Sequence, residues 1–232
     1  DLSVYDLTCE YLSNPMGIES IHPRLSWKIK SSENNVVQVA YRIRVSGNSS
    51  FDGEPLWESG KVVNSESNLL AYDGPALVSG GRYYWQVKVW DNHKNESEWT
   101  SPAFWEMGIL KEEEWKARWI EPEQDTIPNG PAINLRKDFN VSKEIAKARV
   151  YATAHGIYEL YLNGKKVGND LFTPGWTAYR QRLQYQVYDI TDLLQHGLNT
   201  MGALLGEGWY NGFLGYQNKW GLYGNMLGLL MQ

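Results

Sequence analysis

Short segments that alternate apolar with polar residues recur along the whole chain. In the first half they are RLSWKI at 24–29, VAYRIRV at 39–45, RYYWQVKVW at 82–90 and PAFWEM at 102–107. Alternation with a period of two is typical of strands that bury one face, and loops rich in Asn, Ser, Gly and Asp separate these segments. The pattern therefore predicts antiparallel strands, and no segment has a clear helical period.

The second half repeats the pattern after one charged stretch. LKEEEWKARWI at 110–120 contains helix formers and predicts a short helical turn or linker. Within IYELYLNGKKVG at 157–168, Asn163 and Gly164 supply the positive φ angles of a type I′ hairpin turn. We predict an all-β chain of two consecutive antiparallel β-sandwiches: a fibronectin-III-like or immunoglobulin-like domain over 1–109, a linker over 110–117, and a jelly-roll-like sandwich over 118–232.

The last segment, NMLGLLMQ at 225–232, is an apolar run that stops without a turn or a polar tail. A strand in this position needs a partner. We therefore expect the second sandwich to be truncated at its C-terminal end and the chain to be a piece of a longer protein. The alternative is a natural terminus tucked into the sheet.

Composition narrows the classes of function. A net charge of −5 argues against a nucleic-acid partner, and Cys9 is the single cysteine, so neither an internal disulfide nor a cysteine-based zinc site can form. The four histidines are isolated in sequence, and no Gly-x-Ser-x-Gly elbow occurs. No apolar run approaches the length of a bilayer span.

The chain is rich in aromatic residues, with 11 Trp and 15 Tyr. The tryptophans of the first half fall mostly on strand positions, which predicts that they pack in the core: Trp27, Trp57, Trp85, Trp90, Trp99 and Trp105.

Two aromatic loops of the second half are the candidate binding surface. NDLFTPGWTAY at 169–179 places Trp176 on a Pro-Gly turn, and the Gly-rich segment 206–224 is expected to be a long loop. Aromatic faces stack on pyranose C–H groups, while amide and guanidinium groups bind hydroxyls. The alternative is that these rings only pack inside the sandwich or against another domain. The candidate carbohydrate-binding residues are Trp176, Tyr179, Arg182, Trp209, Tyr210 and Asn211.

Several segments, in the same order along the chain, resemble the N-terminal half of bacterial α-L-rhamnosidases. They are YRIRVSG at 41–47, LWESGKV at 56–62, YDGPALVSGGRYYWQVKVWDN at 72–92, the stretch from ARVYATAHG to YDITDLL at 148–194, and LLGEGWYNG at 204–212. The resemblance implies a fibronectin-type-III-like domain followed by a rhamnosidase N-terminal β-sandwich of the carbohydrate-binding-module type. It further implies that an inverting catalytic (α/α)6 barrel lies downstream, so that this chain alone lacks catalytic residues.

The resemblance also implies a possible metal site. In some relatives the second sandwich binds rhamnose through calcium, and the oxygen-bearing candidates for such a site are Asn169, Asp170 and Asn211. The alternative is that these residues form turns, as Asp and Asn beside glycine commonly do. No cofactor is otherwise required.

Three functions follow as hypotheses. The first is the non-catalytic accessory region of an α-L-rhamnosidase, which braces the barrel and binds rhamnose-containing glycosides or polysaccharides. The second is an autonomous calcium-dependent rhamnose-binding module, and the third is a tandem-sandwich adhesion or protein-interaction protein. The expected partners are a rhamnose-containing glycan and the downstream catalytic domain, with no nucleic acid. A periplasmic or secreted location is favoured over a cytoplasmic one.

Overall fold

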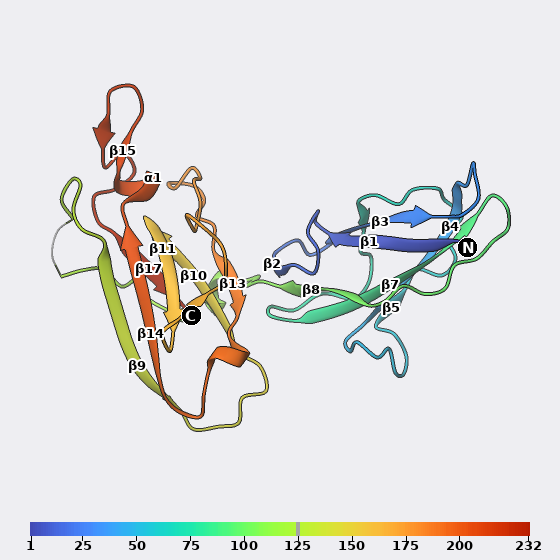
Figure 1. The fold of residues 1–232 in the computed structure, drawn as a ribbon, viewed down its shortest axis with the longest axis horizontal. Coiled ribbons are helices and arrows are strands. Elements are labelled where there is room, and N and C mark those ends of the chain that lie inside the picture. The colour runs from blue at the N-terminus through green and yellow to red at the C-terminus, as the bar shows by residue number, and fades with distance from the viewer. Residues whose placement is uncertain (124–125) are drawn as a thin grey trace. The chain divides into compact units, whose positions relative to one another are not determined.

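A computed structural model of the chain describes residues 1–123 and 126–232. The chain divides into two compact units, Asp1–Glu114 and Trp115–Gln232, each built from β-sheets (Figure 1). The division lies inside the 110–117 segment that the sequence marks as a linker, where η1 (Glu112–Glu114) forms a single helical turn. The all-β fold class is confirmed.

Unit 1 is a sandwich of two sheets. The five-stranded sheet has the order β2-β8-β7-β4-β5 and the three-stranded sheet the order β1-β3-β6, with β2 and β8 as the parallel pair among antiparallel ones. The strands are β1 (Ser3–Cys9), β2 (Met16–Ile18), β3 (Arg24–Lys30), β4 (Gln38–Ser46), β5 (Trp57–Glu58), β6 (Leu70–Ala71), β7 (Arg82–Asp91) and β8 (Ala103–Met107).

The core of unit 1 shows which tryptophans the strand period buries. Trp27, Trp85 and Trp105 are buried, as the sequence predicts. Trp90 and Trp99 are not core residues: Trp90 lies under Lys61 Nζ at 4.0 Å, and Trp99 lies under the Arg44 guanidinium at 4.2 Å. On β7 the inward positions are Trp85, Val87 and Val89, so the period of two turns Trp90 to the opposite face.

Unit 2 is a second sandwich, with sheet orders β12-β11-β14-β9 and β13-β10-β17, and all of its paired strands are antiparallel. Its core contains Ala152, Leu160, Leu205 and Leu229 from both sheets. The elements are β9 (Ile133–Val141), β10 (Arg149–His155), β11 (Ile157–Leu162), β12 (Lys165–Val167), β13 (Gln186–Asp189), η2 (Thr191–Leu193), β14 (Gly197–Gly206), α1 (Gly208–Asn211), β15 (Phe213–Leu214), β16 (Lys219–Trp220) and β17 (Gly228–Met231).

Three local expectations can be compared with unit 2. Asn163 and Gly164 have φ angles of 52° and 80° and join β11 to β12, so the predicted hairpin turn is confirmed. The 206–224 segment is not the one long loop that the sequence predicts, because it contains α1 and the β15–β16 hairpin. The final strand has partners on both sides, since β17 pairs with β10 while Ile120 bridges to Leu229.

Candidate functional site

Two loops of unit 2 meet at the start of β11. The N–H of Tyr158 donates to the Thr173 carbonyl at 2.8 Å, and the Thr173 hydroxyl donates to the Tyr158 carbonyl at 2.7 Å. Strand β11 also pairs with β14, which places Ile157 opposite Gly206. The segment after β12 and the segment after β14 therefore leave the sandwich at the same end (Figure 1).

The Pro-Gly-Trp turn is pinned to the sandwich and projects its tryptophan outward. Gly175 has a φ of +97° and donates its N–H to the Phe172 carbonyl at 3.0 Å. The Tyr179 hydroxyl donates to the Gly175 carbonyl at 2.9 Å. Pro174 is buried, whereas the side chain of Trp176 is 55% exposed. The turn thus holds an indole at the surface.

A glycine lets the second loop lie close to the sheet. Gly208, the first residue of α1, has a φ of +54°, and a Cβ atom there would lie 2.5 Å from Cγ2 of Ile157. Only glycine combines that backbone conformation with that approach. The close packing brings Trp209 and Tyr210 against the first loop.

Aromatic contacts join the two loops. Trp176 stacks on Trp209, Tyr179 meets Tyr210 edge-on at 5.3 Å, and the Trp176 Nε1–H donates to the Tyr223 hydroxyl at 3.3 Å. The structure therefore brings together four residues that the sequence singles out, namely Trp176, Tyr179, Trp209 and Tyr210, and it adds two others. We define the loop-end aromatic cluster as Phe172, Trp176, Tyr179, Trp209, Tyr210 and Tyr223.

A histidine extends this cluster onto the sheet. The His155 imidazole lies between two parallel rings, with centroids 4.0 Å from Trp119 and 4.5 Å from Tyr210 and interplanar angles of 12° and 4°. Burial lowers the pKa of His155, while the nearby Glu121 carboxylate opposes that shift. The sequence contains no signal for this stack, because its three rings come from distant segments of the chain.

Burial keeps two tyrosines of the cluster, Tyr179 and Tyr210, as neutral hydroxyls by raising their pKa values. Burial, with a smaller contribution from Tyr223, raises the pKa of Tyr179 to about 12. Burial also raises the pKa of Tyr210, and the Glu121 carboxylate adds to the shift. Neutral phenols can donate and accept hydrogen bonds.

A different arginine from the expected one connects the two loops. Arg180 Nη2 donates to the Leu222 carbonyl at 3.4 Å, and Arg180 lines a hollow of about 310 Å³ with Ala178, Gln181, Leu222 and Tyr223. Arg182 lies in the same loop with an exposed side chain, and its carbonyl accepts the Thr177 hydroxyl. Arg180 and Arg182 are separated by one residue in an irregular loop. The sequence cannot show which of them contacts the other loop, because no regular period sets the direction of their side chains.

The three oxygen-bearing candidates for calcium lie in different environments. Asn169 and Asp170 are exposed. Burial raises the pKa of Tyr188, and the Asp170 carboxylate adds to that shift. Asn211 is completely buried, and neither its Oδ1 nor its Nδ2 has a hydrogen-bond partner within the described ranges. An unsatisfied buried amide is costly and can indicate an unseen ion or polar ligand. Calcium takes six to eight oxygens, so these three residues alone do not complete a site.

Two carboxylates of unit 2, Asp189 and Glu207, make structural contacts. Asp189 pairs with Arg149 at 2.8 Å and accepts the Thr191 hydroxyl, as its position at a strand end predicts. Glu207 Oε1 accepts the N–H of Asn129 and the indole N–H of Trp220, both at 3.1 Å. Among residues 1–123 and 126–232, no three His, Cys, Asp or Glu side chains gather as a metal site would require.

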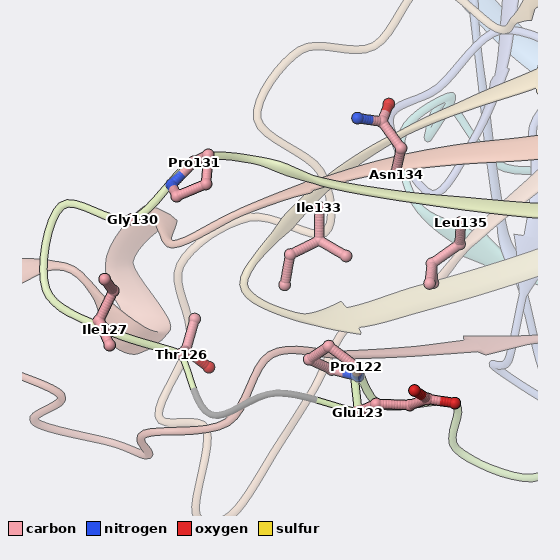
Figure 2. Close-up of a pocket in the computed structure, with 9 residues that line it drawn as sticks. All are labelled: Pro122, Glu123, Thr126, Ile127, Gly130, Pro131, Ile133, Asn134 and Leu135. Atoms are coloured by element: carbon pink, nitrogen blue, oxygen red, sulfur yellow. The ribbon is translucent and has the colours of Figure 1, made fainter.

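A separate hollow of about 490 Å³ lies beside the beginning of β9 (Figure 2). Apolar side chains, among them Pro122, Ile127 and Ile133, make up much of its lining. Thr126 at its margin accepts the N–H of Leu227 at 3.2 Å. None of the residues that the sequence singles out lines it. Within the described ranges, no helix is long and apolar enough to cross a membrane.

Two family models match the chain. Residues 4–111 match the Rha78A-like N-terminal immunoglobulin domain, and residues 143–232 match the α-L-rhamnosidase N-terminal domain. The second match contains both loops of the aromatic cluster. Curated relatives include an α-L-rhamnosidase of Formosa agariphila, 35% identical over 222 residues, and one of an Alteromonas species, 37% identical over 212 residues. The matches cover 91% and 86% of this chain but 24% and 23% of the relatives, so the chain spans about a quarter of their length.

Solved structures agree with these matches. The α-L-rhamnosidase of Aspergillus terreus is 32% identical with a TM-score of 0.91, covering 100% of this chain and 27% of that one. The α-L-rhamnosidase of Dictyoglumus thermophilum is 33% identical with a TM-score of 0.86, covering 99% of this chain and 27% of that one. The two family matches, the relatives and the shared fold lead to one assignment: the chain belongs to the α-L-rhamnosidase family and comprises the N-terminal immunoglobulin-like and rhamnosidase N-terminal domains of that family.

Proposed function

We propose that this chain is the non-catalytic accessory region of an α-L-rhamnosidase, a hydrolase that releases terminal α-L-rhamnose, and that its second unit binds rhamnose-containing glycans. The chain corresponds to about a quarter of its relatives' length, which leaves room for a catalytic domain elsewhere in the polypeptide. The two sandwiches would then brace that domain as well as hold substrate. A glycan-binding role suits a periplasmic or secreted protein.

The proposal that the chemistry lies elsewhere rests on the carboxylates. An inverting glycosidase needs a protonated and an ionised carboxyl group roughly 6.5–9.5 Å apart on opposite sides of a sugar. Asp189 and Glu207 instead each accept hydrogen bonds from neighbouring protein groups. Carboxylates held in this way stabilise the fold and are poorly placed to transfer protons to a ligand.

The exposed indole of Trp176 is the observation that carries the sugar-binding proposal. Trp209 stacks on one face of the Trp176 ring. Trp176 is 55% exposed, which leaves apolar surface for a ligand. The C–H groups of a pyranose, and the methyl group of rhamnose, suit such a surface. Arg180 and Tyr223 line the hollow of about 310 Å³, and Tyr223 is hydrogen-bonded to Trp176. The guanidinium of Arg180 and the hydroxyl of Tyr223 can bind sugar hydroxyls.

Calorimetric titration of this chain with L-rhamnose tests the proposal. We expect saturable heat, and the part of it that comes from the loop-end aromatic cluster should be lost in Trp176→Ala. The matched control is Tyr216→Ala, since Tyr216 is a fully exposed aromatic residue on the neighbouring β15–β16 hairpin and should not affect binding. Equal heats in all three proteins, or none in the unsubstituted chain, would refute sugar binding at this cluster.

A calcium-dependent module is the second candidate, and the buried Asn211 amide favours it. If a calcium ion is coordinated by Oδ1 of Asn211, or sugar hydroxyls bind its Oδ1 and Nδ2, Asn211→Leu should abolish binding at the loop-end aromatic cluster. The same variant should leave the unliganded protein as stable or more stable, because it removes an unsatisfied buried amide. Adding a chelator to the titration separates the two candidates, because only the calcium-dependent module loses its heat.

A further inference from the structure

One glycine on the outer face of unit 2 lies in an uninterrupted strand. The register of the four-stranded sheet aligns Lys166, Tyr161, Gly202 and Arg136 in a single row across β12, β11, β14 and β9. The neighbours of this row along each strand, such as Leu160, Met201 and Ala203, are buried in the core. Since side chains alternate between faces, the row points outward.

Neither backbone conformation nor packing requires glycine at position 202. Its φ is not positive, and a Cβ atom there would lie 3.8 Å from its nearest neighbours, which is ordinary contact. Gly156 is a contrast: it has a φ of +122°, and a Cβ atom would lie 2.4 Å from the Gly206 carbonyl. Glycine weakens a strand interior, and one that is not needed for a bend or bulge can mark the close approach of a ligand or another backbone.

The missing side chain opens a slot of about 460 Å³ between two polar walls. Tyr161 forms one wall and Arg136 the other, while Thr200 and Leu204 lie at the two ends of the Gly202 floor. This volume is within the range of small-molecule sites, roughly 300–1,000 Å³. We define the sheet-face slot by these five residues.

Tyr161 is held away from the glycine. Its hydroxyl donates to Glu159 Oε2 at 2.7 Å, and Lys166 Nζ donates to the other oxygen of that carboxylate at 2.6 Å. Glu159 is two residues earlier on the same strand, so the ring leans along β11 instead of across Gly202. The floor of the slot therefore stays open beside an aromatic wall.

The charges around the slot are paired within the protein. Arg136 lies 3.2 Å from Asp138, whose carboxylate also accepts the Thr200 hydroxyl at 2.7 Å, and Lys166 is paired with Glu159. Pairing of this kind disfavours a strongly charged ligand such as a phosphate. An aromatic wall, a flat backbone floor and a planar guanidinium suit an uncharged ring that carries hydroxyl groups.

We propose that the sheet-face slot is a second carbohydrate-binding site, which takes one pyranose unit of a neutral oligosaccharide against Tyr161 and above Gly202. Arg136 and Thr200 would bind the sugar hydroxyls. The slot shares no residue with the loop-end aromatic cluster, so the two sites can bind separate units of a glycan. This inference stands on the slot and does not depend on binding at the loops.

Amide NMR titration of the 232-residue chain with methyl α-L-rhamnopyranoside and with the disaccharide rutinose tests the proposal. We expect saturable shifts of the amides of Gly202 and its neighbours. Gly202→Val fills the slot with a strand-forming residue and should weaken binding there at least about tenfold without lowering the melting temperature. Tyr161→Leu removes the aromatic wall and should weaken the same site, whereas Trp176→Ala should leave it unchanged.

The results distinguish this inference from the proposed function. Shifts near Gly202 that persist in Trp176→Ala and disappear in Gly202→Val support the slot, whatever happens at the loops. Shifts confined to residues near Trp176 and Trp209 would overturn the slot and leave the proposed function standing. Absence of any saturable shift near Gly202 with both sugars would also overturn it.

Discussion

The ring of Trp176 lies parallel to that of Trp209, with centroids 6.1 Å apart and planes inclined by 9°. The two residues are 33 positions apart in the sequence, on loops that follow different strands. Trp176 is the more exposed of the pair. Trp209 is therefore the inner ring, which supports Trp176, and Trp176 is the outer ring, which can contact a ligand.

Substitution of the two rings should have different effects. Trp209→Ala removes the inner ring and should lower the free energy of unfolding by about 1–3 kcal/mol, because part-buried aromatic contacts are lost. Trp176→Ala should cost less than about 1 kcal/mol while abolishing sugar binding at the loop-end aromatic cluster. Urea unfolding combined with calorimetry measures both quantities. Equal destabilisation by the two variants would contradict the division of roles.

The His155 stack predicts a pH dependence of stability. Burial holds the pKa of folded His155 below its unfolded value of about 6.5. The unfolded chain therefore binds the proton more readily, so the stabilisation is complete above about pH 6.5 and is lost as the pH falls from there toward the folded pKa. Of the charged groups near the ring, Glu121 opposes this loss.

His155→Phe should keep a ring between Trp119 and Tyr210 and remove the titration. We expect the melting temperature of the unsubstituted chain to fall more between pH 7.5 and pH 5 than that of this variant. His196→Gln is the matched control, since His196 is an exposed histidine of the same unit. The explanation fails if His155→Phe retains the full pH dependence.

Two glycines should respond to alanine in opposite ways. Gly164 has a φ of +80° with no atom within 4 Å of its Cβ position, so Gly164→Ala should cost about 1–2 kcal/mol through backbone conformation alone. Gly202 has ordinary backbone angles and free space, so Gly202→Ala should stabilise by about 0.5–1 kcal/mol. Chemical denaturation of both variants provides the comparison, and a loss of stability in Gly202→Ala would show that its glycine has a structural role.

A buried ion pair in unit 1 should matter more than an exposed one in unit 2. Glu106 is fully buried and pairs with Arg82 at 2.8 Å, whereas the side chains of Arg136 and Asp138 are 72% and 47% exposed. Arg82→Leu should cost about 3 kcal/mol because it leaves a buried carboxylate without its cation. Arg136→Leu should cost less than about 1 kcal/mol. Similar costs in urea titrations would argue against this account.

Much of the fold follows from local patterns in the sequence. Alternation identifies the strands around Trp85 and Leu160 because the side-chain period of two is a property of each strand alone. Asn163 and Gly164 identify their hairpin because their conformational preferences act within the turn. The loop tryptophans were also recognisable as surface candidates, since Trp176 follows a Pro-Gly pair.

The arrangement of the site depends on contacts between distant segments. The sequence alone predicts that the chain is all-β and that its second half contains two aromatic segments. The tertiary structure shows that Thr173 and Leu205 both pair with Tyr158, and this pairing brings the two aromatic segments together. The tertiary structure also places His155 between Trp119 and Tyr210 and forms the slot at Gly202 beside Tyr161. The physical reason is that strand pairing joins residues far apart in sequence, and no local preference encodes which strands become neighbours.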